Sequence, residues 1–103
     1  MAFGIGVNSK EADCGKIKGT QTEIACKCWF TSKGRAVPMM IKVQDESGMI
    51  RTVDEIHVNY AEERNYAGVP TVEYDCLLGY QGTCRNVKLV FFKNECRWVM
   101  REG

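Results

Sequence analysis

The sequence predicts an all-β domain: an antiparallel meander of about six short strands that forms a small, partly open barrel. Three observations predict this fold class. Apolar residues recur at every second position from Thr22 onward, which is the period of a strand with one buried face. Turn-forming residues interrupt the alternation at hairpin spacing. No segment shows the pattern of a long amphipathic helix.

Length and composition fit one globular domain. The chain has 103 residues, of which 45% are hydrophobic and 26% are charged, ordinary values for a folded protein. Residues 1–21 are rich in glycine and lack periodicity, so we predict a flexible N-terminal tail and a single barrel domain over 22–103. We identify no membrane-spanning run and no signal peptide, and therefore expect a cytoplasmic protein without a membrane partner.

The first half of the domain contains three predicted strands. Residues 24–30 alternate, with Ile24, Cys26, Cys28 and Phe30 on one face, and a turn at 33–35 follows. Residues 37–43 form the second strand, and the DESG stretch at 45–48 predicts a hairpin because glycine adopts the left-handed conformation easily. The third strand runs over 50–60, where the alternation is less regular.

The second half begins with the longest break, residues 61–70, in which we expect a helical turn before Gly68 and Pro70. Strands follow over 72–78, over 87–91 and from Cys96 to Met100, separated by turns at 79–82 and 93–95. The resulting predicted core contains Ile24, Cys26, Cys28, Phe30, Ile41, Val43, Tyr74, Cys76, Leu89, Phe91 and Trp98.

The six cysteines allow three interpretations. Four of them, Cys26, Cys28, Cys76 and Cys96, fall on predicted core-facing positions, which favours reduced thiols that act as small hydrophobic side chains. Disulfides require an oxidising compartment that this sequence does not indicate. A metal site would take its ligands from the same four thiolates or from His57, although no pair has the spacing typical of structural zinc. We predict no metal and no cofactor, and we expect Cys14 to be the most reactive thiol.

Signals for catalysis are few. The single histidine, His57, lies on a predicted strand and could pair with a cysteine only through the fold. Acidic residues occur at 54–55, at 62–63 and at positions 73 and 75, and a solvated outer face explains them more simply than a pair of catalytic acids. Because phosphate-binding glycine loops and nucleophile motifs are missing from the sequence, we predict that the protein is not an enzyme.

The face opposite the predicted core combines cations with large apolar side chains. We select as a candidate interaction face Lys27, Trp29, Lys88, Phe92, Arg97 and Arg101. A solvated sheet face is normally polar, so this face needs a cover. Part of the chain itself, a protein partner or second copy, and a single-stranded nucleic acid are the three candidates. The net charge of +1 counts against nucleic acid.

The chain also resembles a group of small proteins, through a set of positions between residues 24 and 101: Gly34, Arg35, Pro38, Lys42, Gly48, Val53, Ile56, Tyr74, Leu89, Val90, Phe91, Cys96, Arg97 and Trp98. The group consists of small β-barrel proteins of Gram-positive bacteria, often carried on mobile or conjugative elements and without an assigned activity. A looser similarity, limited to the basic and aromatic start and to Trp98, extends to a small barrel family encoded beside error-prone DNA polymerases. This resemblance implies no assigned activity, and it favours the nucleic-acid alternative only slightly.

From these observations we expect a non-catalytic interaction module that binds a protein partner or itself as a homodimer. The first alternative is a nucleic-acid-binding module of a mobile element. The second alternative is a metal-binding protein that uses Cys26, Cys28, Cys76 and Cys96.

Overall fold

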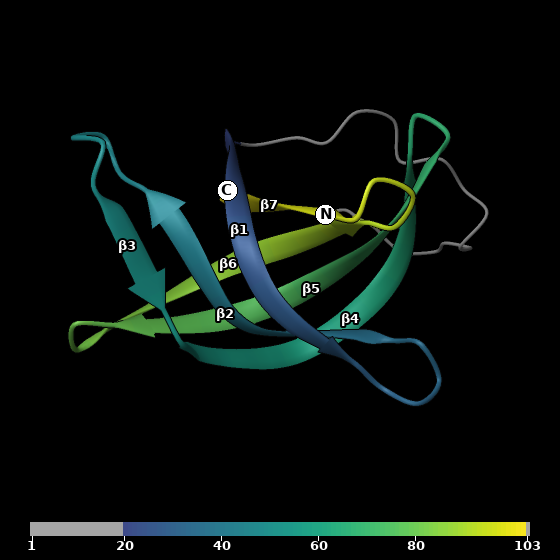
Figure 1. Ribbon diagram of the computed structural model, residues 1–103, viewed down its shortest axis with the longest axis horizontal. Coiled ribbons are helices and arrows are strands. Elements are labelled where there is room, and N and C mark those ends of the chain that lie inside the picture. The colour runs from purple at the N-terminus through teal and green to yellow at the C-terminus, as the bar shows by residue number, and fades with distance from the viewer. Residues whose placement is uncertain (1–19, 103) are drawn as a thin grey trace.

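The computed structural model describes residues 20–102 and confirms the all-β class. One antiparallel sheet of seven strands curls into a half-barrel (Figure 1). The strands are β1 (Thr20–Phe30), β2 (Ala36–Gln44), β3 (Ile50–Val53), β4 (Glu55–Tyr66), β5 (Val69–Tyr80), β6 (Thr83–Phe92) and β7 (Arg97–Glu102). Their order across the sheet is β3-β2-β1-β7-β6-β5-β4, so β3 and β4 form its two edges.

The connection between these two edges makes the sheet curl. Only Asp54 separates the end of β3 from the start of β4. One residue spans at most about 3.6 Å, so the two edges must meet at this point. Across the curl β2 contacts β4 and β3 contacts β5. The Tyr74 hydroxyl on β5 donates a hydrogen bond to the Ala36 carbonyl oxygen on β2 at 2.5 Å, which links the two walls directly.

The core fills the concave side of this half-barrel. It contains Ile41, Tyr74, Cys76, Leu89 and Trp98, which are all buried. Trp98 is the central ring, with its centroid 5.4 Å from that of Tyr74 and 4.9 Å from that of Phe91. The predicted core residues on the β1–β2 wall, namely Ile24, Cys26, Cys28 and Val43, are half-buried and pack against this cluster.

The predicted break at residues 61–70 is wrong, because this segment is a tight β-hairpin. β4 continues to Tyr66 and β5 begins at Val69, so only Ala67 and Gly68 form the loop. Both have positive φ, 51° and 84°, which is the type I′ turn that matches the twist of paired strands. Gln81 and Gly82 form the same turn between β5 and β6. Because Asp54 divides the predicted third strand in two, the count rises from about six strands to seven.

Two predicted core positions lie outside the core. Cys96 is exposed in the β6–β7 turn with a φ of 52°, since β7 begins one residue later, at Arg97. Phe30 faces the core side, and its ring lies 6.3 Å from that of Phe91, but it is 56% exposed because β1 ends there. β1 begins at Thr20, inside the predicted tail, since Thr20 and Gln21 pair with Glu102 and Arg101. The remaining tail residues and Cys14 lie outside the described residues.

Candidate functional site

The predicted interaction face is divided by the fold into two parts. Lys88, Phe92, Arg97 and Arg101 are neighbours on the sheet face opposite the core, because Lys88 pairs with Arg101 and Phe92 pairs with Arg97 between β6 and β7. Lys27 and Trp29 lie on a part of β1 that pairs only with β2, since the pairing of β1 with β7 ends at Ile24. The two parts are therefore separate surfaces.

The β6–β7 part is largely engaged within the chain. Phe92 is only 7% exposed, and the Arg97 guanidinium lies 4.2 Å from its ring centroid. The Lys88 ammonium lies 3.2 Å from a carboxylate oxygen of Asp75 and donates to the Tyr60 hydroxyl at 2.9 Å. These contacts leave little of the β6–β7 part for an external partner.

Arg101 belongs to a buried ionic cluster around Glu73, a residue that sequence analysis had treated as a solvated acid. The Glu73 side chain is fully buried on the face opposite the core. Its Oε2 accepts hydrogen bonds from Arg101 Nη2 and from the Tyr66 hydroxyl, each at 2.6 Å. Arg64 Nη2 lies 3.7 Å from the other Glu73 oxygen and 2.8 Å from Glu62 Oε1. The alternation of β5 placed Glu73 on the face opposite the core, but no sequence pattern indicated Arg101 as its partner, since the residue level with Glu73 on β7 is Val99.

The β1–β2 part carries the most exposed aromatic side chains. Trp29 is 65% exposed, Phe30 is 56% exposed and Met39 is 50% exposed. Met39 lies at an irregularity of the backbone, since the register of β1 against β2 shifts between Lys27 and Cys28 and leaves Met39 without a partner in the register. A β-bulge of this kind turns a side chain away from its regular face. Trp29 and Phe30 are adjacent on β1 and therefore point to opposite faces of the hairpin, so apolar side chains are exposed on both faces of its end.

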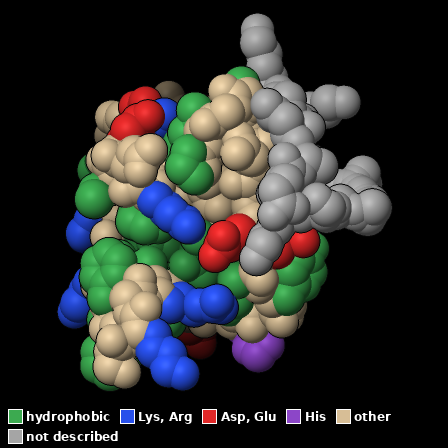
Figure 2. Space-filling view, turned by 90° about the vertical axis from the view of Figure 1, so that its right-hand side faces the viewer, with side chains coloured by type: hydrophobic (Ala, Val, Ile, Leu, Met, Phe, Trp, Pro, Cys, Tyr) green, Lys and Arg blue, Asp and Glu red, His purple; other side chains and the backbone are tan. Residues whose placement is uncertain are grey.

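Three exposed cations accompany these side chains. Lys27 precedes Trp29 by two residues on the same face of β1, and Lys33 and Arg35 lie in the loop that joins β1 to β2. Among the ion pairs of residues 20–102, none involves Lys27, Lys33 or Arg35. We call the six residues Lys27, Trp29, Phe30, Lys33, Arg35 and Met39 the hairpin patch. Figure 2 faces the end of the molecule that carries this loop and shows hydrophobic and cationic side chains side by side.

The cysteines do not gather into a metal site within the described part of the chain. Residues 20–102 contain no group of three or more His, Cys, Asp or Glu side chains placed to hold a metal ion. Cys76 is buried in the core, Cys26 and Cys28 pack against it, and Cys96 lies apart in its turn. All five described cysteines are free thiols.

The thiols of Cys26, which is half-buried, and of Cys76, which is buried, are also poor nucleophiles. Burial, together with the neighbouring Cys28, raises the pKa of Cys26 from 9.0 to about 12, and burial raises the pKa of Cys76 to about 12. His57 is exposed on β4 opposite Leu77, whereas its neighbour Val58 pairs with Cys76. Since adjacent residues of a strand point to opposite faces, the imidazole and the Cys76 thiol lie on different sides of the sheet.

None of the residues that the structure describes belongs to a helix with the length and apolar character needed to cross a membrane. Comparison of the chain with protein-family models, with curated proteins and with solved structures gave no match.

Proposed function

We propose that this chain is a non-catalytic interaction module whose hairpin patch binds a protein surface that combines acidic and apolar side chains. The observation that carries the proposal is the exposure of two consecutive aromatic residues, Trp29 at 65% and Phe30 at 56%, at the end of the hairpin beyond its bulge. Exposed aromatic side chains with cations beside them are typical of binding hot spots.

The hairpin presents these side chains in a fixed arrangement. Trp29 pairs with Val37 and Phe30 pairs with Ala36, so the backbone that carries both rings is held by the β1–β2 ladder. The Phe30 ring also packs edge-on against Phe91 of the core. Binding therefore orders few additional groups, which favours affinity for a given contact area.

The charges of the patch indicate the character of the partner. Lys27, Lys33 and Arg35 supply three positive charges at an exposed apolar surface, and acidic groups at its rim would speed association and set the orientation. A second copy of this chain offers exposed acids toward both ends of β4, Asp54 and Glu55 at one end and Glu62 and Glu63 toward the other, of which Glu62 and Glu63 are paired with Arg64 and Lys93. Self-association is therefore the first case to test.

Two observations support the non-catalytic part of the proposal and a cytoplasmic location. The raised pKa values of Cys26 and Cys76 keep both thiols protonated, and His57 lies on the other face of the sheet. The free state of the five described cysteines agrees with a reducing compartment.

Single-stranded nucleic acid is the second candidate partner. Bases stack on exposed aromatic rings, and neighbouring lysine and arginine side chains attract the phosphates. Trp29 and Phe30 beside Lys27, Lys33 and Arg35 provide both elements. The overall charge of +1 provides no general attraction to a polyanion, so we place this candidate second.

The proposal is tested with the double variant Trp29→Ser/Phe30→Ser. Sedimentation velocity at increasing protein concentration measures self-association, and titration with a peptide of alternating Glu and Leu represents an acidic partner. We expect at least one of the two interactions in the wild-type protein, weakened at least tenfold in the variant. The matched control is Met49→Ser/Ile50→Ser, which removes two side chains that are each 58% exposed but lie at the β2–β3 turn.

The intrinsic fluorescence gives a second readout. Trp29 is exposed and Trp98 is buried, so a change in tryptophan emission on binding reports on Trp29. If the protein is monomeric, does not bind the acidic peptide and binds oligothymidylate with a steep salt dependence, the partner is nucleic acid and not a protein. A protein that binds none of these probes, or a double variant that binds as well as the control, would contradict the proposal.

A further inference from the structure

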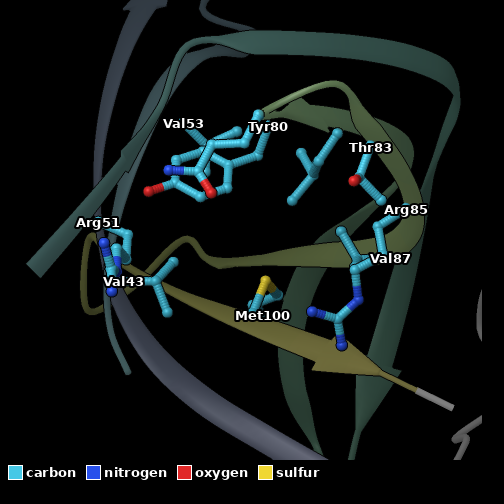
Figure 3. A pocket seen from close by; sticks show the side chains of 10 residues that line it. Val43, Arg51, Val53, Tyr80, Thr83, Arg85, Val87 and Met100 are labelled. Atoms are coloured by element: carbon cyan, nitrogen blue, oxygen red, sulfur yellow. The ribbon is translucent and has the colours of Figure 1, made fainter. Parts of the chain in front are cut away.

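A pocket of about 340 Å³ lies at the end of the half-barrel where β5 turns into β6. Its lining comes from five strands, β2, β3, β5, β6 and β7, so it forms only when the sheet curls. Figure 3 shows Val43, Val53, Val87 and Met100 around this space, with Arg51 and Arg85 on either side of the Met100 side chain. The volume is within the range of small-molecule sites, which runs from roughly 300 to 1,000 Å³.

The floor of the pocket is apolar and continuous with the core. Val53, Leu78, Val87 and Met100 line it, and each is less than a tenth exposed. They pack against one another in the main core cluster, so the floor is fixed before any ligand arrives. A floor of this kind favours an apolar group and offers it no hydrogen bonds.

The rim, in contrast, consists mainly of hydrogen-bond donors. Arg51 comes from β3 and Arg85 from β6, and the hydroxyl-bearing residues Tyr80 and Thr83 lie close to them in the lining. Arg51 also interacts with the Tyr80 hydroxyl. No acidic residue lines the pocket within the described part of the chain. The rim is therefore suited to a group that accepts several hydrogen bonds.

Two carboxylates hold the arginines from outside the pocket. Arg51 Nε donates to Asp45 Oδ2 at 2.8 Å, and Arg85 Nη2 contacts Glu102 Oε1. Neither Asp45 nor Glu102 belongs to the lining. A guanidinium group has five N–H donors, and each of these contacts uses one nitrogen. The acids thus orient the two guanidinium groups, and the donors that these acids and the Tyr80 hydroxyl leave unused are available to a ligand in the mouth.

Asp45 is held in place by hydrogen bonds within the turn between β2 and β3. Asp45 Oδ1 accepts hydrogen bonds from the Ser47 amide at 3.0 Å, from the Ser47 hydroxyl at 2.7 Å and from the Met49 amide at 2.9 Å. The hydrogen bonds from Ser47 and Arg51 lower the pKa of Asp45 to about 2. The carboxylate is therefore ionised at neutral pH and keeps Arg51 in place.

We infer that this pocket binds a small amphiphile, with an apolar body on the floor and an anionic head, such as a carboxylate, at Arg51 and Arg85. The inference is independent of the proposed function, because the hairpin patch lies at the other end of β2. The volume lies near the lower end of the range for small-molecule sites, which favours a short ligand. Octanoate, with an eight-carbon chain, is a probe of suitable length.

The test uses the methionine methyl groups of the full chain as NMR reporters. Met100 lines the pocket, whereas Met39 lies in the hairpin patch and serves as the internal control. Octanoate is titrated alongside octanol and octylamine, which share its chain but carry a neutral or a cationic head. We expect a saturable shift of the Met100 signal with octanoate, at least tenfold weaker binding of octylamine, and no shift at Met39.

Two sets of variants distinguish binding of the anionic head group by the arginines from binding of the apolar chain in the pocket. Arg51→Met/Arg85→Met removes the proposed head-group donors and is expected to weaken octanoate binding at least tenfold while changing octanol binding less than threefold. Arg97→Met is the matched control, since Arg97 is an exposed arginine paired with Glu95 away from the pocket. Thr83→Trp places a large side chain at an exposed rim position of β6 and is expected to abolish both interactions without unfolding the domain.

Three results would overturn the inference. The first is the lack of any saturable Met100 shift with octanoate. The second is equal affinity for octanoate and octylamine, since the arginines would then play no part. The third is unchanged octanoate binding by Thr83→Trp, because the ligand would then bind elsewhere. None of these results depends on the hairpin patch, so the two proposals can fail separately.

Discussion

Glu73 on β5 and Arg101 on β7 form an ion pair on the sheet face opposite the core, with Arg101 Nη2 2.6 Å from Glu73 Oε2. The Glu73 side chain is fully buried and that of Arg101 is 14% exposed. Strand β6 lies between β5 and β7. Its residue Val90, which pairs with Glu73 on one side and with Val99 on the other, is also buried. An ion pair in this setting is sensitive to the loss of either partner.

We predict that Glu73→Ala strongly destabilises the domain. The substitution leaves the Arg64 and Arg101 guanidinium groups in a buried position without this carboxylate, which costs about 3–5 kcal/mol in the free energy of unfolding. Urea denaturation followed by tryptophan fluorescence measures the loss. The control is Glu62→Ala, which removes the more exposed of the two carboxylates near Arg64. We expect this substitution to lower the free energy of unfolding by less than about 1 kcal/mol. Equal effects of the two substitutions would show that the buried cluster contributes no more than a surface pair.

Tyr74→Phe tests the closure of the half-barrel. The variant keeps the ring that packs on Trp98 and removes only the hydroxyl that donates to the Ala36 carbonyl oxygen. Loss of a hydrogen bond that leaves a buried acceptor unpaired costs about 1–3 kcal/mol. Thermal unfolding should show a lower melting temperature, and hydrogen exchange should be faster in β2. Tyr60→Phe, which removes an exposed hydroxyl, should have little effect; a Tyr74→Phe protein as stable as this control would contradict the role of the cross-wall bond.

The thiols are predicted to differ in reactivity according to their burial. In the native protein iodoacetamide should modify Cys84 and Cys96, which are exposed, long before Cys76. The thiolate is the reactive form, and a pKa of about 12 leaves almost none of it at Cys76 or Cys26 near pH 8. Peptide mapping by mass spectrometry gives the order, and in denaturant without reductant all six cysteines should react. Early native modification of Cys76 would contradict its place in the core.

The same two thiols predict a loss of stability in alkali. Folding raises the pKa of Cys26 and Cys76 above the ordinary 9.0, so the folded state favours the protonated thiols. Their contribution is therefore complete below pH 9 and is lost as the pH rises from 9 to about 12. Urea midpoints measured across this range should fall for the wild-type protein and fall less for Cys26→Ala/Cys76→Ala, compared with each protein's own midpoint at pH 7.

Cys96→Gly is predicted to stabilise the protein. Cys96 adopts a φ of 52°, which costs a residue with a Cβ atom about 1–2 kcal/mol, while glycine adopts this conformation freely. The expected net gain is about 0.5–1 kcal/mol after allowing for the entropy of glycine in the unfolded chain. Cys84→Gly is the matched control, because Cys84 is an exposed cysteine inside β6, where glycine is expected to destabilise by a similar amount. The control excludes a general effect of removing a thiol.

The amino-acid sequence determined the fold class through local rules. Alternation on strands such as 24–30 and 87–91 assigned the core face correctly. A period of two places every second side chain on the same face, so the apolar residues Ile24, Cys26 and Leu89 had to face the core. Glycine at 48 and 82 marked turns that the structure contains. The interpretation of 61–70 failed because Ala67 occupies a left-handed position that usually signals glycine or asparagine, so the two-residue turn was hidden.

The tertiary structure decided what each strand face contacts. Phe92 and Trp29 both follow the outer-face pattern, yet Phe92 is buried and Trp29 is exposed, because β1 leaves its pairing with β7 at Ile24. Glu73 looks like any solvated acid until β4 and β7 bring Arg64 and Arg101 to it. The pocket could not be predicted either, since its lining comes from five strands that meet only when Asp54 joins the two edges of the sheet. Periodicity reports which side of a strand is apolar, and only the curl of the sheet determines which side chains from distant strands meet.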